Sequence, residues 1–327
     1  MSVKKIAVIG AGQIGSRHLQ ALARLELPVE VEVYDPNIES LKLAKKRLAE
    51  VINPHRELKV KYLSRFEELS KEINLAIIAT CADIRAVITV QLINHSRIEN
   101  IIFEKILFQS LVDYEKIGQS LRAKNISAWV NCVRRTYPIY RQVKSLLGDK
   151  SNNIVFHLLG GEWGLTCNAI HFLDLLAFLT GSLTVEIDAS GLDSDPIPSK
   201  RAGFYESTGT LRGRFVGGSE FFLTALRGSS TPHLISITSD KVIVVIDENH
   251  GCARLAYKKG NWNWQNIHFS IPYQSEWTDK LVSSILEGQK PGLPSYEESA
   301  VIHIAFLRAL LDRYGHLGGW GKVCPIT

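Results

Sequence analysis

A lysine and an acid stand where a strand is predicted to end, and both could act on a small molecule. Glu104 and Lys105 follow directly after the apolar run Ile101–Phe103. A lysine at a strand end can bind a substrate hydroxyl and stabilise the negative charge that develops on an alkoxide. The same two residues could instead form a surface ion pair, so their position leaves both interpretations open.

An imidazole and a carboxylate form the second candidate group. His171 and Asp174 are three residues apart in a predicted apolar helix, Asn168–Leu179, and therefore share one of its faces. In the first turn of a helix the dipole disfavours imidazolium, so His171 would be a neutral base that Asp174 could orient. We expect Asn168 to cap the helix. The alternative is that His171 only packs against its apolar neighbours.

Arginines make up the third group. Arg134 and Arg135, close to Tyr137, lie at the predicted junction of two domains, and Arg85 follows an earlier strand. Guanidinium groups at the edge of a cleft suit a carboxylate or a phosphate on the substrate. These residues therefore favour an acidic or phosphorylated substrate, with an ion pair between the domains as the structural alternative for Arg134 and Arg135.

A glycine turn near the N-terminus indicates where a cofactor would bind. The sequence Gly10-Ala-Gly12-Gln13-Ile14-Gly15 follows the apolar run Ile6–Ile9 and leads into a predicted helix, Ile14–Leu25. Gly10 permits the tight turn, Gly12 leaves room for a diphosphate, and Gly15 lets the helix pack close to the strand. The helix N-terminus offers free N–H groups and a positive dipole end to the phosphates.

The next strand carries the residue that selects the cofactor. Asp35 ends the apolar run Val31–Tyr34, 20 residues after Gly15, and is followed by Pro36 and Asn37 rather than by arginine. A carboxylate at this place accepts hydrogen bonds from ribose hydroxyls and repels a 2′-phosphate. We therefore predict NAD rather than NADP. A glycine turn needed only for packing is the alternative.

Strands and helices alternate up to residue 133 and must position these groups. The pattern predicts an α/β domain over residues 1–133, with a doubly wound parallel Rossmann sheet whose carboxyl edge carries Thr80, Glu104 and Lys105 beside the cofactor. Six apolar runs are the predicted strands: Val3–Ile9, Val29–Tyr34, Leu58–Leu63, Leu75–Thr80, Asn100–Glu104 and Ser127–Val133.

Residues 134–327 follow a different pattern. After two predicted helices, strands follow one another from Thr184 to Ile271, with a hairpin turn at Gly217-Gly218, and two further helices end the chain at Glu276–Glu287 and Glu297–Tyr314. We predict a C-terminal α+β domain with an open, mostly antiparallel sheet that binds the substrate.

Composition excludes several classes of function. The 327 residues are 45% hydrophobic and 22% charged, with a net charge of +5, and contain neither a long basic run nor an apolar stretch that could span a bilayer. We expect no nucleic acid, membrane or metal partner. Five scattered cysteines without a CxxC pair favour a reducing compartment, and a strand starting at Lys4 leaves no room for a signal peptide, so we expect a cytoplasmic protein.

Taken in order, these motifs resemble the Gfo/Idh/MocA family of oxidoreductases over nearly the whole chain. The matching segments are Val8–His18, which is similar to the family's opening; Glu104-Lys105-Ile106, similar to its Glu-Lys-Pro; Arg135-x-x-Pro138; His171-x-x-Asp174 before Gly181; and Leu293–Glu298.

The resemblance implies hydride transfer between nicotinamide C4 and a sugar carbon. Lys105 and His171 would lie on either side of the reacting hydroxyl, with Asn168 and Asp174 supporting them. The open sheet would pack against another subunit, giving homodimers or homotetramers. Two other functions remain open: a non-catalytic dinucleotide-binding or redox-sensing module, and a reductase of a non-sugar substrate such as a linear tetrapyrrole or an imine.

The chain departs from the family pattern mainly on the substrate side. Cys167 stands where many members carry an aspartate four residues before the histidine, and Ile106 replaces the proline of Glu-Lys-Pro. Thr80-Cys81-Ala82 replaces Thr-Pro-Asn, and Arg85 replaces a usual histidine. These changes leave the cofactor motif intact.

Overall fold

The computed structural model describes residues 3–51, 58–148, 153–318 and 320–327, and the chain divides into two compact units. Unit 1 comprises residues 1–108, 112–131 and 272–296, and unit 2 comprises residues 109–111, 132–271 and 297–327. The predicted boundary at residue 133 lies close to the crossing from unit 1 to unit 2 at residues 131–132. The segment 272–296, however, was predicted to be part of the second domain and instead belongs to unit 1.

Unit 1 is built on the predicted parallel sheet. Its six strands have the order β3-β2-β1-β4-β5-β6, and every neighbouring pair is parallel. The last four residues of β1 and of β4 are buried, which explains their continuous apolar character. The strands are β1 (Lys4–Ile9), β2 (Val29–Tyr34), β3 (Lys59–Leu63), β4 (Glu72–Ile78), β5 (Arg97–Phe103) and β6 (Ser127–Val130).

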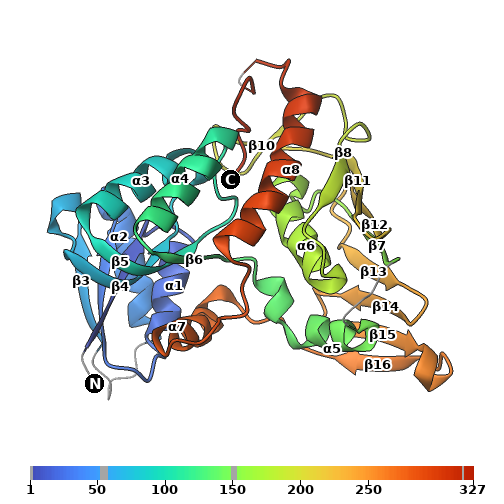
Figure 1. Ribbon diagram of the computed structural model, residues 1–327, viewed down its shortest axis with the longest axis horizontal. Coiled ribbons are helices and arrows are strands. Elements are labelled where there is room, and N and C mark those ends of the chain that lie inside the picture. The colour runs from blue at the N-terminus through green and yellow to red at the C-terminus, as the bar shows by residue number, and fades with distance from the viewer. Residues whose placement is uncertain (1–2, 52–57, 149–152, 319) are drawn as a thin grey trace. The chain divides into compact units, whose positions relative to one another are not determined.

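The strand order reverses between β1 and β4. In open α/β sheets, ligands bind in the crevice at the carboxyl ends of the strands beside such a reversal. The glycine turn follows β1 at this edge, and Glu104 follows β5. The strands β4, β5 and β6 lie next to one another in this sheet (Figure 1). The helices between the strands are α1 (Gly15–Leu22), α2 (Ile38–Ala49), α3 (Ala82–His95) and α4 (Leu111–Ala123), with a short 3-10 helix η1 (Phe66–Glu68).

The returning segment of unit 1 closes the sheet beyond β6. Its elements η4 (Gln274–Glu276) and α7 (Thr278–Leu286) pack against α1. The main-chain N–H of Val130 donates to Pro294 O at 3.1 Å, and the Tyr296 hydroxyl donates to Tyr114 O at 2.7 Å. Residues far along the chain therefore complete the Rossmann unit.

Unit 2 contains the predicted open sheet. Its order is β16-β15-β14-β13-β7-β12-β11-β8, and every pair is antiparallel except β7 and β12. The strands are β7 (Val155–Gly160), β8 (Val185–Asp188), β11 (Gly209–Phe215), β12 (Glu220–Ala225), β13 (Leu234–Thr238), β14 (Val242–Asp247), β15 (Cys252–Tyr257) and β16 (Gln265–His268). The predicted hairpin at Gly217-Gly218 joins β11 to β12.

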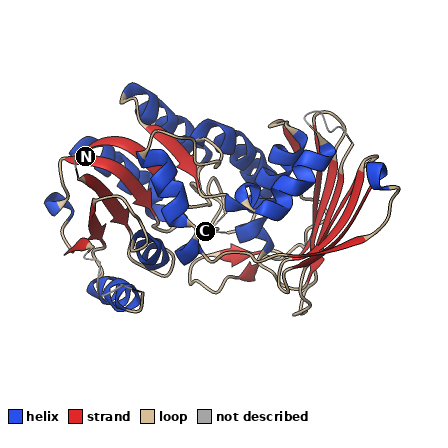
Figure 2. Cartoon of the chain, turned by 90° about the horizontal axis from the view of Figure 1, so that it is seen from below, coloured by secondary structure: helices blue, strands red, loops and turns tan. Residues whose placement is uncertain are grey.

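Helices cover one face of this sheet, as Figure 2 shows. Phe156 and Leu158 of β7 are fully buried on the covered face, while Val155 and Leu159 are 38% and 52% exposed on the other. This alternation is what a sheet with one free face requires. The remaining elements of the unit are α5 (Pro138–Leu147), α6 (Leu165–Thr180), α8 (Tyr296–Tyr314), the pair β9 (Ile197–Pro198) and β10 (Tyr205–Glu206), and the 3-10 helices η2 (Val133–Thr136) and η3 (Lys258–Gly260).

A search of the described ranges for a helix both long and apolar enough to cross a bilayer finds none.

Candidate functional site

The three glycines of the turn differ in what surrounds them. Gly10 has φ +94°, and a Cβ there would lie 2.9 Å from Thr80 N. A Cβ on Gly15 would lie 1.8 Å from Gly10 O, so only glycine fits. A Cβ on Gly12 would have no described heavy atom within 4 Å. The fold thus explains Gly10 and Gly15, whereas the open space at Gly12 suits the close approach of a diphosphate.

Asp35 lies beside this turn and holds it. Its Oδ2 accepts a hydrogen bond from Ala11 N at 2.8 Å, and its Oδ1 accepts one from Asn37 N at 2.9 Å. Asn37 in turn caps α2 by accepting from Glu39 N. The carboxylate is half-buried, and each of its oxygens has a second lone pair that can accept a ribose hydroxyl.

The sequence analysis missed an arginine that forms hydrogen bonds with the glycine turn. Arg47 of α2 donates to Gln13 O at 2.9 Å and to Ser16 Oγ at 2.7 Å, and it also contacts the Gln13 side chain. Burial and the nearby charge of Arg17 lower the pKa of Arg47. The sequence does not distinguish Arg47 from Lys45 and Lys46, two basic residues of the same helix that are exposed in the structure.

Glu104 is the centre of a buried polar network at the end of β5. Its Oε1 accepts from His18 Nε2 at 2.9 Å and from Asn131 Nδ2 at 2.5 Å. Burial raises the pKa of Glu104, but the hydrogen bond and charge of His18, the Asn131 hydrogen bond and the charge of Lys105 together leave that pKa below its ordinary value. Glu104 is therefore an ionised carboxylate inside unit 1, next to Lys105, and not part of a surface ion pair.

Arg85 is buried and forms hydrogen bonds with main-chain oxygens. Its guanidinium donates to the main-chain oxygens of Glu104 (2.8 Å) and Leu107 (3.1 Å), and it also bonds Ile106 O and Thr80 O. Arg85 is only 2% exposed. The expectation that it favours an acidic substrate is therefore replaced by a structural role at the ends of β4 and β5.

The two arginines of unit 2 are paired within that unit. Arg134 forms a bidentate pair with Glu248, with Nε–Oε1 at 3.1 Å and Nη2–Oε2 at 2.9 Å. Arg135 forms another with Asp174, at 2.9 and 2.7 Å. Both pairings differ from the two sequence-based interpretations, a substrate contact and an ion pair between domains. The partners lie 114 and 39 residues away in the chain, which no local pattern reveals.

Both oxygens of Asp174 accept from Arg135, a partner that the sequence did not indicate. Burial raises the pKa of Asp174 to about 6, against the lowering effect of Arg135, while Glu298 adds to the rise. At neutral pH the carboxylate is therefore ionised and paired.

The helix that carries His171 begins earlier than predicted. Gly164, in the left-handed region at φ +76°, precedes its first residue, Leu165. Glu206 from β10 caps the helix by accepting from Thr166 N at 2.9 Å, whereas Asn168 Nδ2 donates back to Trp163 O at 3.0 Å. The prediction that Asn168 is the cap was wrong.

The earlier start of α6 changes the electrostatics of its histidine. His171 lies in the second turn, where the helix dipole acts more weakly than in the first. The argument for a neutral His171 from the dipole is correspondingly weaker. His171 is half-buried on α6.

Glu248 gathers further partners around Arg134. The Tyr140 hydroxyl donates to Glu248 Oε1 at 2.6 Å, and His233 Nε2 lies 3.5 Å from Oε2. Burial raises the pKa of Glu248, but Arg134, His233 and Tyr140 lower it to about 2. Burial also raises the pKa of Tyr137 to about 12, against the charge of Arg134. Tyr137 is only 6% exposed and so offers little surface to a substrate.

This cluster should make the stability of the protein depend on acid. Because the folded pKa of Glu248 lies below its ordinary value of 4.5, its stabilising contribution is complete above pH 4.5 and is lost as the pH falls towards 2. We expect the difference in unfolding free energy between wild type and Glu248→Gln to shrink by about 3 kcal/mol between pH 5 and pH 2. Urea unfolding at fixed pH values measures it, and a constant difference would contradict this account.

Comparison with known proteins finds a family match for the N-terminal part of the chain. Residues 4–132 match the Gfo/Idh/MocA model, described as an oxidoreductase family with an NAD-binding Rossmann fold. No curated protein matches the chain by sequence.

Solved structures share the fold over nearly the whole chain. UDP-N-acetylglucosamine 3-dehydrogenase GnnA from Acidithiobacillus ferrooxidans has a TM-score of 0.70 at 13% identity, covering 94% of this chain and 97% of its own. An oxidoreductase from Agrobacterium radiobacter in complex with NAD+, L-tartaric acid and magnesium has a TM-score of 0.72 at 15% identity, covering 96% and 97%. The transcriptional regulator Gal80p from Kluyveromyces lactis has a TM-score of 0.67 at 14% identity, covering 92% and 90%.

At these identities the solved structures establish the fold alone. The glycine turn, the parallel sheet and the family match describe the same stretch of chain. Residues 4–132 therefore match the Gfo/Idh/MocA model of oxidoreductases with an NAD-binding Rossmann fold, and nearly the whole chain shares the fold of the solved structures named above.

Proposed function

We propose that the protein is a cytoplasmic, NAD-dependent oxidoreductase acting on the CH–OH group of a sugar or sugar derivative. The observation that carries this proposal is the ionised, buried Glu104 beside Lys105 at the carboxyl end of β5. The glycine turn lies at the same edge of the same sheet. A lysine at this edge is suited to act beside a bound nicotinamide.

The residues have separate tasks in this proposal. The diphosphate would lie on the glycine turn, with contacts from Gln13 and Ile14, and Asp35 would accept the ribose hydroxyls. Thr80 and Glu104, which follow β4 and β5, would lie beside the cofactor at the same edge of the sheet. The nicotinamide, when bound, supplies or accepts a hydride.

Two side chains of this chain would act at the reacting oxygen of the substrate. The Lys105 ammonium would donate a hydrogen bond to the substrate oxygen and stabilise its developing charge, and the His171 imidazole would take up or return the hydroxyl proton. Lys105 belongs to unit 1 and His171 to unit 2. Asn168, bonded to Trp163 O, would support the start of α6 rather than touch the substrate.

We propose a sugar without a required acidic group. The case for an acidic or phosphorylated substrate rested on Arg85, Arg134 and Arg135, and all three guanidinium groups are engaged inside the protein. A paired arginine can no longer offer its charge fully to a substrate anion.

A substrate panel tests the proposal. The purified protein is incubated with NAD+ and a broad set of sugars, polyols and sugar acids, and NADH formation is followed by absorbance. We expect turnover with at least one neutral sugar or polyol. Binding of NAD without turnover across the panel would reject the dehydrogenase.

That second result would favour a non-catalytic dinucleotide-binding module. Two observations support this alternative: Asp174 is committed to Arg135, and the transcriptional regulator Gal80p shares the fold. Calorimetry of NAD binding, with the panel, separates the two functions.

The cofactor preference depends on Asp35. We expect Asp35→Ala to weaken NAD binding by about tenfold to a hundredfold, because hydrogen bonds to a charged group contribute about 1.5–3 kcal/mol. NADP binding should change little or improve, since the repulsion of a 2′-phosphate is removed. Titration with both cofactors measures the ratio, with the exposed Glu39→Ala as control. An unchanged ratio would reject the assignment.

We also propose that the free face of the unit 2 sheet joins subunits into a dimer or tetramer. Leu159 pairs with Leu234 in register, and both are about half exposed, at 52% and 47%. Val155 and Val245 add further exposed apolar surface on the same face. Contiguous exposed apolar surface of this kind is typical of interfaces.

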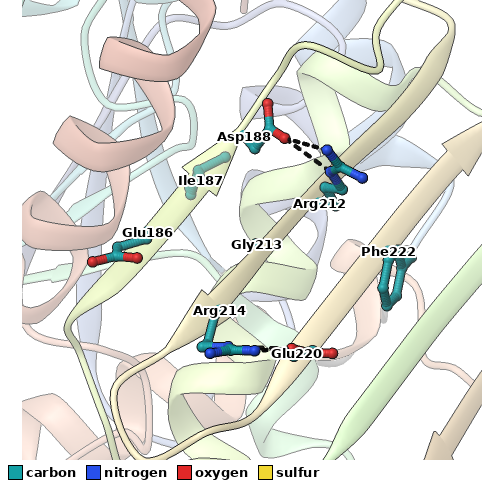
Figure 3. Close-up of a pocket in the computed structure, with 8 residues that line it drawn as sticks. All are labelled: Glu186, Ile187, Asp188, Arg212, Gly213, Arg214, Glu220 and Phe222. Atoms are coloured by element: carbon teal, nitrogen blue, oxygen red, sulfur yellow. Dashed lines mark hydrogen bonds and ion pairs between the residues drawn. The ribbon is translucent and has the colours of Figure 1, made fainter.

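The same face carries a depression of about 360 Å³ towards β8 (Figure 3). Its charges are matched in pairs, with Arg212 on Asp188 at 2.8 Å and Arg214 on Glu220. Sedimentation velocity tests the interface: wild type should sediment as an oligomer and Leu159→Asp as a monomer, and a monomeric wild type would reject it.

A further inference from the structure

A buried polar network joins four separate segments of unit 1 beside Lys105. His18 of α1 contacts Glu104 through Nε2 and Thr278 of α7 through Nδ1, both at 2.9 Å. Asn131, after β6, donates from Nδ2 to Glu104 and, at 2.9 Å, to Gln274 Oε1. His18, Asn131 and Thr278 are at most 2% exposed. Polar side chains buried this completely are costly unless their hydrogen bonds are made.

The hydrogen bonds define which atoms of the network hold protons. An ionised carboxylate only accepts, so His18 Nε2 carries a proton that it donates to Glu104. Thr278 Oγ1 donates to Gln274 O at 3.1 Å and accepts from the Gln274 side chain at 2.6 Å. The Thr278 hydroxyl also lies 2.9 Å from His18 Nδ1, so the His18 ring is held through both of its nitrogens.

Two sets of contacts thus hold the end of β5 on either side of Lys105. His18 and Asn131 hold the Glu104 side chain, and Arg85 holds the main-chain oxygens of Glu104 and Leu107. His18 lies in the helix that starts from the glycine turn, three residues after Gly15. The network therefore connects α1 to Glu104, the residue next to Lys105.

We propose that His18 is a positioning residue that acts through Glu104 on the Lys105 ammonium, and that Thr278 keeps the His18 ring in its donating orientation. This inference rests on the proposed function, because it assigns Lys105 a catalytic task. It adds to the proposed function that Thr278, in a distant segment of the chain, influences Lys105 through His18 and Glu104.

Removing the His18 ring contacts should change the chemistry of Lys105 even without a substrate. Without the His18 donor, the charge of Glu104 is less compensated and the neighbouring ammonium is more strongly stabilised. In His18→Phe we expect the pH midpoint of Lys105 acetylation to rise by at least half a unit. At pH 8 the acetylation rate should then fall about threefold, since one pH unit corresponds to a tenfold change.

The measurement uses the full-length protein without cofactor. Trace acetylation with acetic anhydride across pH 6–11 is quantified at Lys105 by peptide mass spectrometry, after circular dichroism has confirmed folding. Thr278→Val, which changes little but the hydroxyl, should shift the midpoint in the same direction, and Thr278→Ser should restore the wild-type value. Ser96→Ala is the matched control, since it removes a buried 2.7 Å hydrogen bond to Ser70 O at the opposite end of β5.

The outcomes separate this inference from the proposed function. If Thr278→Val or His18→Phe folds and the Lys105 midpoint equals that of wild type and Ser96→Ala, the positioning role is rejected. A shifted midpoint together with no turnover in the substrate panel would reject the dehydrogenase and leave the coupling of His18 to Lys105 standing. If His18→Phe does not fold, the Thr278 pair decides alone.

Discussion

Replacing Lys105 by methionine should lower kcat by about a hundredfold to ten-thousandfold, the range that a positioned proton donor contributes. The residue follows the buried carboxylate Glu104 at the end of β5, and methionine keeps the length of the side chain without its charge. NAD affinity should stay within about twofold, because the glycine turn and Asp35 are untouched. Steady-state kinetics with the substrate found in the panel, and calorimetry with NAD, measure the two effects.

Lys116→Met is the control for this experiment, since Lys116 is an exposed lysine on α4 in the same unit. It should leave both kcat and NAD affinity unchanged. If Lys105→Met keeps the wild-type kcat, the proposed mechanism fails. If it loses NAD affinity in proportion to its activity, Lys105 serves the cofactor rather than the substrate.

Gly15→Ala should mainly lower the stability of the protein, whereas Gly12→Ala should mainly weaken NAD binding. A Cβ on Gly15 would lie 1.8 Å from Gly10 O, so the backbone must move and the unfolding free energy should fall by about 3 kcal/mol. A Cβ on Gly12 meets no described heavy atom within 4 Å, so stability should change by less than about 0.5 kcal/mol. The same Cβ would occupy the space of the diphosphate and should weaken NAD binding at least about tenfold.

Urea unfolding and NAD titration of the two variants check these effects together. Each variant is the control of the other, because they introduce the same methyl group three residues apart. A Gly12→Ala protein that binds NAD as wild type does would show that the diphosphate does not lie on this turn. A Gly15→Ala protein of full stability would contradict the described contact with Gly10.

Much of the Rossmann unit follows from local sequence. A strand buried on both faces must be apolar throughout, so β1, β4 and β5 are visible as apolar runs. The tight turn at Gly10 requires φ +94°, a conformation that glycine adopts without strain, and this makes the turn visible as well. These features depend on a few neighbouring residues, and the structure confirms both the parallel sheet and the open sheet that follows it.

The start of α6 shows where local reasoning fails. A polar residue before an apolar helix normally marks the cap, which is why Asn168 was expected there. Glu206, 40 residues beyond Thr166, accepts a hydrogen bond from the Thr166 N–H, and the helix begins at Leu165, three residues before Asn168. When the capping side chain comes from another element, the sequence of the helix itself does not indicate where the helix begins.

The sequence by itself determined the glycine turn, the strands and the two kinds of sheet, because backbone conformation and burial act over a few residues. Only the tertiary structure decided the partners of the buried polar side chains: Asp174 for Arg135, and Thr278 for a histidine 260 residues away. Several acids and donors are chemically equivalent in the sequence. A buried charge pairs with whichever of them packing brings within about 3 Å, and that choice depends on the whole fold.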